Sequence, residues 1–349
     1  MTSTSPSEAL GASAALVPIT IVSGFLGAGK TTLLKRVLTD PHGIRFGVLV
    51  NDFGAINIDA ELIVSTAGAA GAEQVNLANG CICCTIRDDL VQAARQLLET
   101  RPRPDHIVIE TSGVSRPLAV VEALESGLAD AARIEAVFCL VDAAGFADLD
   151  FAATELAIDQ AASADLVIVN KCDLADAAVL ATLDATLTGA SPRARLLRTS
   201  YARVPFEVLF GPEQARPATS TAHRELGRVH IHRHDEPCGL DCDAAHEHDH
   251  DHGMEFQAWQ WRSAVPVDPA RFRVAMRSLP PGLLRAKGIV AFAGRTDERG
   301  ILQVVGRRCE LHAQSGTPPS ESLLVAIGRR GSFDGAALTR LFDGSLSEA

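Results

Sequence analysis

Short apolar runs alternate with segments of helical periodicity from about residue 17 to residue 200. Between the runs, residues 88–99 carry apolar side chains at helical spacing, as at Leu90 and Ala94. The runs are nearly continuous in Val, Ile and Leu, which is typical of strands buried on both faces. They cover residues 19–22, 46–50, 107–109, 136–141, 166–169 and 196–197. The alternation predicts an α/β fold in which helices cover a parallel sheet.

The alternation stops near Phe210. Residues 211–222 are rich in Gly, Pro, Ser and Thr, which is typical of a linker, and residues 233–252 are polar and dense in histidine. A second, smaller unit follows, and its pattern predicts an α+β fold. Its expected strands cover residues 256–261, 288–292, 301–305 and 323–327, and its expected helices cover residues 269–279 and 335–342.

Composition excludes several classes of protein. The chain has 349 residues, of which 47% are hydrophobic and 21% charged, so we expect a globular protein long enough for two domains. A formal net charge of −11 argues against nucleic-acid binding, and no apolar run reaches the roughly 18 residues of a membrane span. Residues 1–10 carry no basic side chain and do not resemble a signal peptide. We therefore expect a cytoplasmic protein with no nucleic-acid or membrane partner, whose eight cysteines are thiols or metal ligands.

The segment from Gly24 to Thr31 fits the phosphate-loop pattern of Gly, four residues, Gly-Lys-Ser/Thr. Glycines let the backbone curl so that successive N–H groups point at phosphate oxygens. Lys30 supplies a positive charge to the β- and γ-phosphates, and Thr31 supplies a hydroxyl to Mg²⁺. The predicted nucleotide-binding residues of this loop are Gly24, Gly27, Ala28, Gly29, Lys30, Thr31 and Thr32.

An acidic residue ends a later apolar run, where Glu110 follows residues 107–109 and Gly113 lies three residues further on. A carboxylate at this position of a phosphate-loop protein holds Mg²⁺ or its water shell. Glu110 is therefore predicted to join Thr31 at Mg²⁺. Gly113 can bring a backbone N–H to the γ-phosphate.

The apolar run 166–169 is followed by Asn-Lys-x-Asp, in which the named residues are Asn170, Lys171 and Asp173. A carboxylate such as Asp173 can accept from N1–H and the 2-amino group of guanine, whereas adenine has neither donor. Asn170 and the stem of Lys171 can brace the loop and cover the base. At a strand end downstream of a phosphate loop, this pattern predicts GTP rather than ATP.

Three cysteines, Cys81, Cys83 and Cys84, fall within four consecutive positions after Asn79 and Gly80. Thiolates are soft ligands that Zn²⁺ and related transition metals prefer. Three ligands leave a tetrahedral ion one open position, which suits transfer of the ion better than a permanent structural site. The alternative is that these are three apolar cysteines of the core.

Together these motifs resemble the CobW-type GTPases, phosphate-loop proteins tied to metal delivery. The resemblance rests on residues 24–32, 50–54, 79–84, 110–113, 170–173 and 284–289. It implies a GTPase domain followed by a smaller C-terminal domain. It also implies that Cys81, Cys83 and Cys84 bind a transition metal, usually Zn²⁺ or Co²⁺, in a manner coupled to the nucleotide state.

The acid after the second predicted strand departs from the family pattern. Many members carry Glu before Phe-Gly, where this chain carries Asp52. The acid is one methylene shorter, and two contacts stay open for it: Mg²⁺ through water, or the loop of the cysteine motif. Lys30, Glu110 and Asp52 are the candidate catalytic residues.

A histidine-rich tract at residues 246–252 alternates imidazole with carboxylate through His246, His248, His250 and His252. Imidazole suits Zn²⁺ and Co²⁺, and a tract without apolar residues cannot pack into a core. We interpret it as a collector of metal ions with low specificity. The alternative is a solvated polar linker.

The expected organisation is a disordered N-terminal tail (1–15), a P-loop GTPase domain (16–210), a linker with the histidine-rich tract (211–253) and a CobW-type C-terminal domain (254–349). The predicted function is that of a Mg²⁺-dependent GTPase, monomeric or homodimeric, that binds Zn²⁺ or Co²⁺ with GTP and delivers it to a client metalloprotein. Two alternatives remain open. One is a metal-storage or sensing protein with a regulatory nucleotide site, and the other is an ordinary regulatory GTPase whose cysteines lie in the core.

Overall fold

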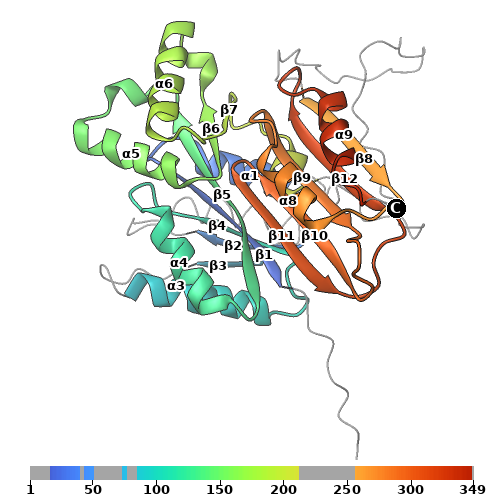
Figure 1. The fold of residues 1–349 in the computed structure, drawn as a ribbon. Coiled ribbons are helices and arrows are strands. Elements are labelled where there is room, and N and C mark those ends of the chain that lie inside the picture. Colours follow the sequence, from blue (N-terminus) through green and yellow to red (C-terminus); the bar gives the residue numbers. More distant parts are fainter. Residues whose placement is uncertain (1–15, 40–42, 51–72, 77–84, 212–255, 348–349) are drawn as a thin grey trace, which may run out of the picture.

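The computed structural model describes residues 16–39, 43–50, 73–76, 85–211 and 256–347. The first part is a seven-stranded sheet with the order β3-β2-β4-β1-β5-β6-β7, and each neighbouring pair is parallel (Figure 1). Its strands are β1 (Val17–Gly24), β2 (Phe46–Val50), β3 (Glu73–Asn76), β4 (His106–Glu110), β5 (Ala132–Asp142), β6 (Leu166–Asn170) and β7 (Leu196–Arg198). The predicted parallel sheet is confirmed.

Helices cover both faces of this sheet. Successive side chains of the buried strands point to opposite faces, so both faces are apolar and both are covered. Ile19 and Ile21 of β1 pack in one core with residues of α3 to α6, whereas Val22 packs on the other face with residues of α1 and α7. The helices are α1 (Lys30–Thr39), α3 (Thr85–Glu99), α4 (Pro117–Leu128), α5 (Phe151–Ser163), α6 (Ala177–Ala190) and α7 (Phe206–Phe210). No helix in the described ranges has both the length and the apolar composition needed to cross a membrane.

The second part is a five-stranded antiparallel sheet with the order β11-β10-β9-β12-β8. Its strands are β8 (Phe256–Ser263), β9 (Leu283–Val290), β10 (Glu298–Val305), β11 (Arg308–Ser315) and β12 (Ser322–Arg329), and its helices are α8 (Pro269–Arg277) and α9 (Gly335–Asp343). Phe342 of α9 stacks on Trp259 at a centroid distance of 5.4 Å. The prediction of a smaller α+β unit is confirmed.

Three strands differ from the expected pattern. β9 begins at Leu283 rather than at residue 288, because the buried Arg285 and Lys287 interrupt the apolar run. β11 was not predicted, since it is an edge strand whose residues are mostly half-buried or exposed. β3 was also missed, because four residues with the sequence Glu-Gln-Val-Asn carry too little apolar signal.

The second sheet covers the face of the first sheet that also carries α1 and α7 (Figure 1). Leu284 of β9, Val305 of β10 and Ile327 of β12 belong to the same buried cluster as Phe138 of β5 and Phe210 of α7. The two sheets therefore share one hydrophobic core.

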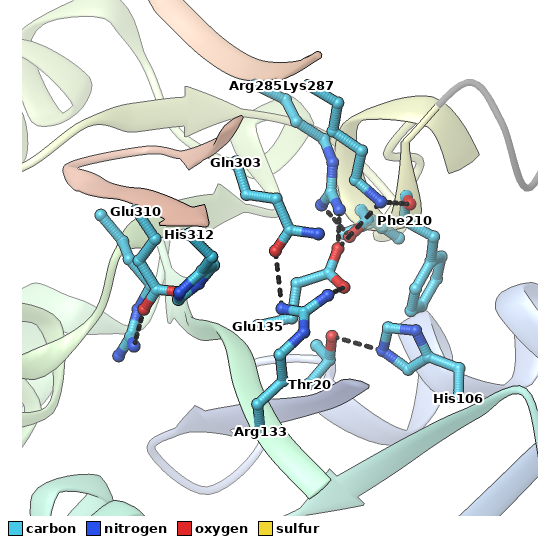
Figure 2. A network of polar contacts seen from close by, with 12 residues as sticks. Thr20, His106, Arg133, Glu135, Phe210, Arg285, Lys287, Gln303, Glu310 and His312 are labelled. Atoms are coloured by element: carbon cyan, nitrogen blue, oxygen red, sulfur yellow. Dashed lines mark hydrogen bonds and ion pairs between the residues drawn. The ribbon is translucent and has the colours of Figure 1, made fainter. Parts of the chain in front are cut away.

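A buried polar network crosses this interface (Figure 2). Glu135 of β5 pairs with Arg285, and Lys287 Nζ lies 3.2 Å from the same carboxylate. The two cations also donate to the carbonyl groups of Leu209 and Phe210 at the end of α7. Burial alone raises the pKa of Glu135, but the charges of Arg285 and Lys287 outweigh it and hold the pKa well below its usual range.

A second junction joins β6 to the turn between β10 and β11. Arg308 Nε donates to Asp165 Oδ2 at 2.9 Å, and the backbone N–H of Arg307 donates to the carbonyl of Asp165 at 3.0 Å. Gly306 directly precedes Arg307 and has a φ of +51°, and a Cβ there would lie 1.8 Å from the Asp165 carbonyl oxygen. Only glycine permits this approach of the two backbones.

His106 begins β4 and is buried near the network of Glu135, Arg285 and Lys287 (Figure 2). Its Nε2 lies 2.8 Å from the Thr20 hydroxyl, and its ring stands edge-on to Phe210 with the centroids 5.0 Å apart. Burial lowers the pKa of His106 to about 3, which the nearby Glu135 carboxylate only partly opposes. The imidazole is therefore neutral at physiological pH.

Candidate nucleotide site

The loop between β1 and α1 has the backbone that a phosphate cradle requires. Gly24, Gly27 and Gly29 have φ values of +132°, +74° and +105°, which L side chains rarely adopt. A Cβ at Gly24 would lie 2.2 Å from the Leu140 carbonyl oxygen, and one at Gly29 would lie 2.4 Å from Asn170 Nδ2. These glycines therefore allow the loop to lie directly against the ends of β5 and β6.

Lys30 begins α1, and its side chain turns back over the loop that precedes it. Its Nζ donates to the carbonyl oxygens of Gly24 at 2.9 Å and Phe25 at 3.2 Å. The residue is buried. The ammonium charge is thus held within the loop at the N-terminal end of a helix, where an anion is favoured.

Thr31 and Glu110 come from distant parts of the chain and meet at the carboxyl edge of the sheet. Thr31 Oγ1 donates to Glu110 Oε1 at 2.9 Å. Glu110 ends β4 and is buried. A hydroxyl and a carboxylate beside a phosphate-binding loop are the hard oxygen donors that Mg²⁺ requires, so these residues fit the predicted magnesium site.

Gly113 lies in the connection from β4 to α4 and touches the P-loop. A Cβ at Gly113 would lie 2.6 Å from Leu26 Cδ2 and 2.7 Å from the Leu26 backbone nitrogen. The structure therefore brings Gly113 against the P-loop from a distant part of the chain.

Asn170 links the P-loop to the connection after β7. Its Nδ2 donates to the Ala28 carbonyl at 2.9 Å, and its Oδ1 accepts from the Ala202 N–H at 2.8 Å. Asn170 therefore ties the P-loop to this connection. Asp173 lies at the same edge, where its backbone N–H donates to Ser200 Oγ at 3.2 Å and the residue is exposed.

Sequence reasoning missed two residues at this edge. Asp142 ends β5 and accepts from Lys171 Nζ at 2.6 Å. The signal for it was an acid directly after the apolar run 136–141, the same signal that marked Glu110. Gln160 of α5 donates to the connection that holds Gly113. Its signal was a polar residue on the buried stripe of α5, between Ala157 and Ala161.

Thr32 lies in the first turn of α1, and the remaining predicted site residues lie outside the described part of the chain. They are Asp52, Cys81, Cys83, Cys84, His246, His248, His250 and His252. Among the residues that the structure does describe, no three His, Cys, Asp or Glu side chains gather into a metal-binding group. The cysteine motif and the histidine-rich tract therefore stay predictions.

A parallel sheet with a phosphate loop after β1, a Thr–carboxylate pair and an Asn-Lys-x-Asp segment after β6 defines a P-loop GTPase. Residues 18–198 match the family described as CobW/HypB/UreG, nucleotide-binding domain, and residues 256–346 match the one described as Cobalamin synthesis protein cobW C-terminal domain. The chain belongs to the CobW/HypB/UreG family.

The chain is also similar to the following relatives and solved structure. Over 328 residues the chain is 35% identical to the zinc chaperone CobW of Pseudomonas aeruginosa, covering 85% of this chain and 83% of that protein. It is 33% identical over 225 residues to the zinc-regulated GTPase metalloprotein activator 1 of Dictyostelium discoideum, covering 55% of this chain and 47% of that protein. The crystal structure of Zn(II)-bound YjiA GTPase from E. coli matches with a TM-score of 0.44 and 20% identity, covering 95% of this chain and 100% of that one.

Proposed function

We propose that this protein is a GTP-hydrolysing metallochaperone that binds Zn²⁺ or Co²⁺ in its GTP state and delivers it to a client metalloprotein. One observation carries the nucleotide part: Thr31 Oγ1 meets Glu110 Oε1 at 2.9 Å, next to an ammonium held inside a glycine loop. The family and the zinc chaperone of Pseudomonas aeruginosa support the metal part. The proposed place of work is the cytoplasm, where thiol ligands stay reduced.

Charge stabilisation and base recognition in GTP hydrolysis each have a group at this edge of the sheet. Mg²⁺, held by Thr31 and Glu110, would supply positive charge to the β- and γ-phosphates. Lys30 stabilises the charge that develops as the γ-phosphoryl group leaves, and the Gly113 N–H donates to the γ-phosphate. Asp173 accepts from the two donors of guanine, which sets the preference for GTP over ATP.

The metal cargo is assigned to Cys81, Cys83 and Cys84. The carboxyl ends of all strands of a parallel sheet lie at one edge, so β3 ends at the edge that carries Glu110 and the P-loop. In the sequence, the motif follows five positions after the last residue of β3. Asp52 follows β2 in the same way. Three thiolates suit Zn²⁺ and Co²⁺ alike, and the histidine-rich tract would collect ions for this site.

The GTP state is proposed to order the connections after β2, β3 and β4, which include Asp52, the three cysteines and Gly113. Hydrolysis removes the γ-phosphate and relaxes them, so that the ion passes to the client. Linkage then makes the effect reciprocal. If GTP tightens the binding of the metal ion by some factor relative to GDP, the metal ion tightens the binding of GTP relative to GDP by the same factor.

Metal affinity in the two nucleotide states tests this proposal. Zn²⁺ affinity is measured by competition with a chromophoric chelator, once with a non-hydrolysable GTP analogue and once with GDP. We expect clearly tighter binding with the analogue, thiolate-to-metal absorption when Co²⁺ is used, and loss of both when all three cysteines are changed to Ser. Equal affinity in the two states would contradict the chaperone cycle and favour storage.

A further inference from the structure

Gln160 of α5 donates two hydrogen bonds to the connection between β4 and α4, which also contacts the P-loop. The residue is 0% exposed. Its Nε2 donates to the Gly113 carbonyl at 3.0 Å and to the Ser115 carbonyl at 2.8 Å. Carbonyl oxygens only accept hydrogen bonds, so the NH₂ group of the amide must face the connection.

The connection itself is a tight turn with fixed ends. The Ser115 N–H donates to the Ser112 carbonyl at 3.0 Å, and the Thr111 N–H donates to the Val22 carbonyl of β1 at 3.0 Å. Gly113 lies so close to Leu26 that even a Cβ would not fit. The turn is thus held by contacts to β1, to the P-loop and to Gln160.

These contacts set the direction of one particular donor. The Ser112 carbonyl and the Gly113 N–H belong to the same planar trans peptide, so they point in opposite directions. Because Ser112 accepts from Ser115 N–H, and Gln160 holds the carbonyls of Gly113 and Ser115, the peptide planes on both sides of Gly113 are fixed. Within the described part of the chain, the Gly113 N–H itself donates to no acceptor.

We propose that Gln160 is a positioning residue for GTP hydrolysis, which holds the Gly113 N–H in the orientation that meets the γ-phosphate before the nucleotide binds. The inference rests on the proposed nucleotide site. A donor that is already oriented needs no reorganisation as charge develops on the γ-phosphate oxygens, which is how a fixed dipole lowers a barrier.

A side chain that served packing alone would look different. Gln160 Oε1 is buried and has no hydrogen-bond partner in the described structure, which costs free energy that an apolar residue of the same size would not incur. The favourable part of this side chain is therefore its two donated bonds. The nearby ion pair of Asp159 with Arg116 also joins α5 to this connection, but its side chains are 47% and 69% exposed, so solvent screens it.

The full-length protein with two substitutions of nearly constant volume tests the proposal. Gln160→Met removes both donors, and Gln160→Glu replaces them with oxygens that face the two carbonyl groups. We expect kcat for GTP to fall about 10- to 100-fold, the preference for a GTP analogue over GDP to fall with it, and GDP affinity to stay within about twofold. Asp159→Asn is the matched control on the same helix and should behave as the wild type.

The possible failures can be told apart. If Gln160→Met keeps the wild-type kcat and nucleotide preference while Lys30→Ala is inactive, the positioning role is wrong and the nucleotide site stands. If Lys30→Ala hydrolyses GTP at the wild-type rate, the proposed nucleotide site fails and the positioning role fails with it. A parallel loss of GDP affinity and kcat in both variants would reduce Gln160 to a structural residue.

A measurement on the unaltered protein covers the case in which the variants do not fold. Hydrogen exchange of residues 112–116 is followed with GDP and with the GTP analogue. The Ser115 N–H, which donates to the Ser112 carbonyl, should show the same strong protection in both states, because Gln160 already holds the turn. The Gly113 N–H should gain protection only with the analogue, when the γ-phosphate is there to accept from it. Protection of the Ser115 N–H that develops only with the analogue would overturn the proposal.

Discussion

Arg285 of β9 and Glu135 of β5 form an ion pair across the domain interface in which each side chain is only 1% exposed. Lys287 shares the carboxylate, and both cations donate to carbonyls at the end of α7 (Figure 2). Charges taken out of water are tolerated only while their partners remain in place. The docked arrangement of the two sheets is what keeps these charges together.

Glu135→Gln should destabilise the protein strongly, because it leaves Arg285 and Lys287 buried without their counter-charge. We expect a loss of about 3–5 kcal/mol in the free energy of unfolding, measured by urea denaturation. Asp105→Asn breaks the Arg45 pair, whose side chains are 49% and 46% exposed, and should matter far less. Equal effects of the two substitutions would show that the buried network contributes nothing beyond a surface pair.

Because of His106, the free energy of unfolding should fall as the pH decreases. Its pKa is lowered by burial to about 3, whereas in the unfolded chain it is about 6.5. Between these values only the unfolded state binds the proton, so the free energy of unfolding falls by up to about 1.4 kcal/mol per pH unit as pH decreases. His106→Gln keeps a polar partner for Thr20. It should make the free energy of unfolding depend less steeply on pH, by the contribution of the one proton that His106 takes up on unfolding.

The same substitution at a half-exposed histidine, His312→Gln, is the control for the His106 experiment. A slope that is the same in the wild type and in His106→Gln would contradict the burial of a neutral imidazole at the start of β4.

Gly306→Ala should reduce the stability of the protein by more than the strain of a left-handed backbone alone would. Gly331→Ala is the matched control, because Gly331 also has a positive φ, of +74°, but a Cβ there would meet nothing within 4 Å. The control should lose about 1–2 kcal/mol from left-handed strain alone, whereas Gly306→Ala adds a clash with the Asp165 carbonyl at 1.8 Å. Equal losses in thermal unfolding would show that the two backbones can separate without cost.

Asp173→Asn should change which nucleotide base the protein prefers to bind. The wild-type protein is expected to bind GTP at least about 100-fold more tightly than ATP, because a carboxylate that faces adenine finds neither of the two donors that guanine offers. The amide should weaken GTP and favour xanthine nucleotides, whose 2-oxo group accepts from it. Competition binding with the three nucleotides measures this, and equal wild-type affinity for GTP and ATP would exclude the assignment of Asp173.

Glu110→Gln should raise the Mg²⁺ concentration that half-maximal GTP hydrolysis requires while leaving GDP binding in the absence of Mg²⁺ nearly unchanged. The amide still accepts the hydrogen bond from the Thr31 hydroxyl but carries no charge for the cation. Titration of activity with Mg²⁺ measures the shift. An unchanged Mg²⁺ dependence would show that the Thr31–Glu110 contact is structural.

Local chemistry was sufficient to predict the parallel sheet and to single out the residues of the proposed nucleotide site. The phosphate loop lies within the eight residues from Gly24 to Thr31, and its glycines, lysine and hydroxyl are all adjacent in the chain. β2 and β6 are buried at every position, so their apolar runs are visible without any knowledge of their neighbours. The acids that follow such runs could be found because a strand end is itself a local feature.

Only the tertiary structure decided which polar groups could be buried. Arg285 and Glu135 lie 150 residues apart, and Gln160 and Gly113 lie 47 residues apart. In a hydrophobic pattern, Arg285 and Gln160 count only as interruptions. The cost of burying them is offset by partners that folding brings from distant segments, and no periodicity along the chain records those partners.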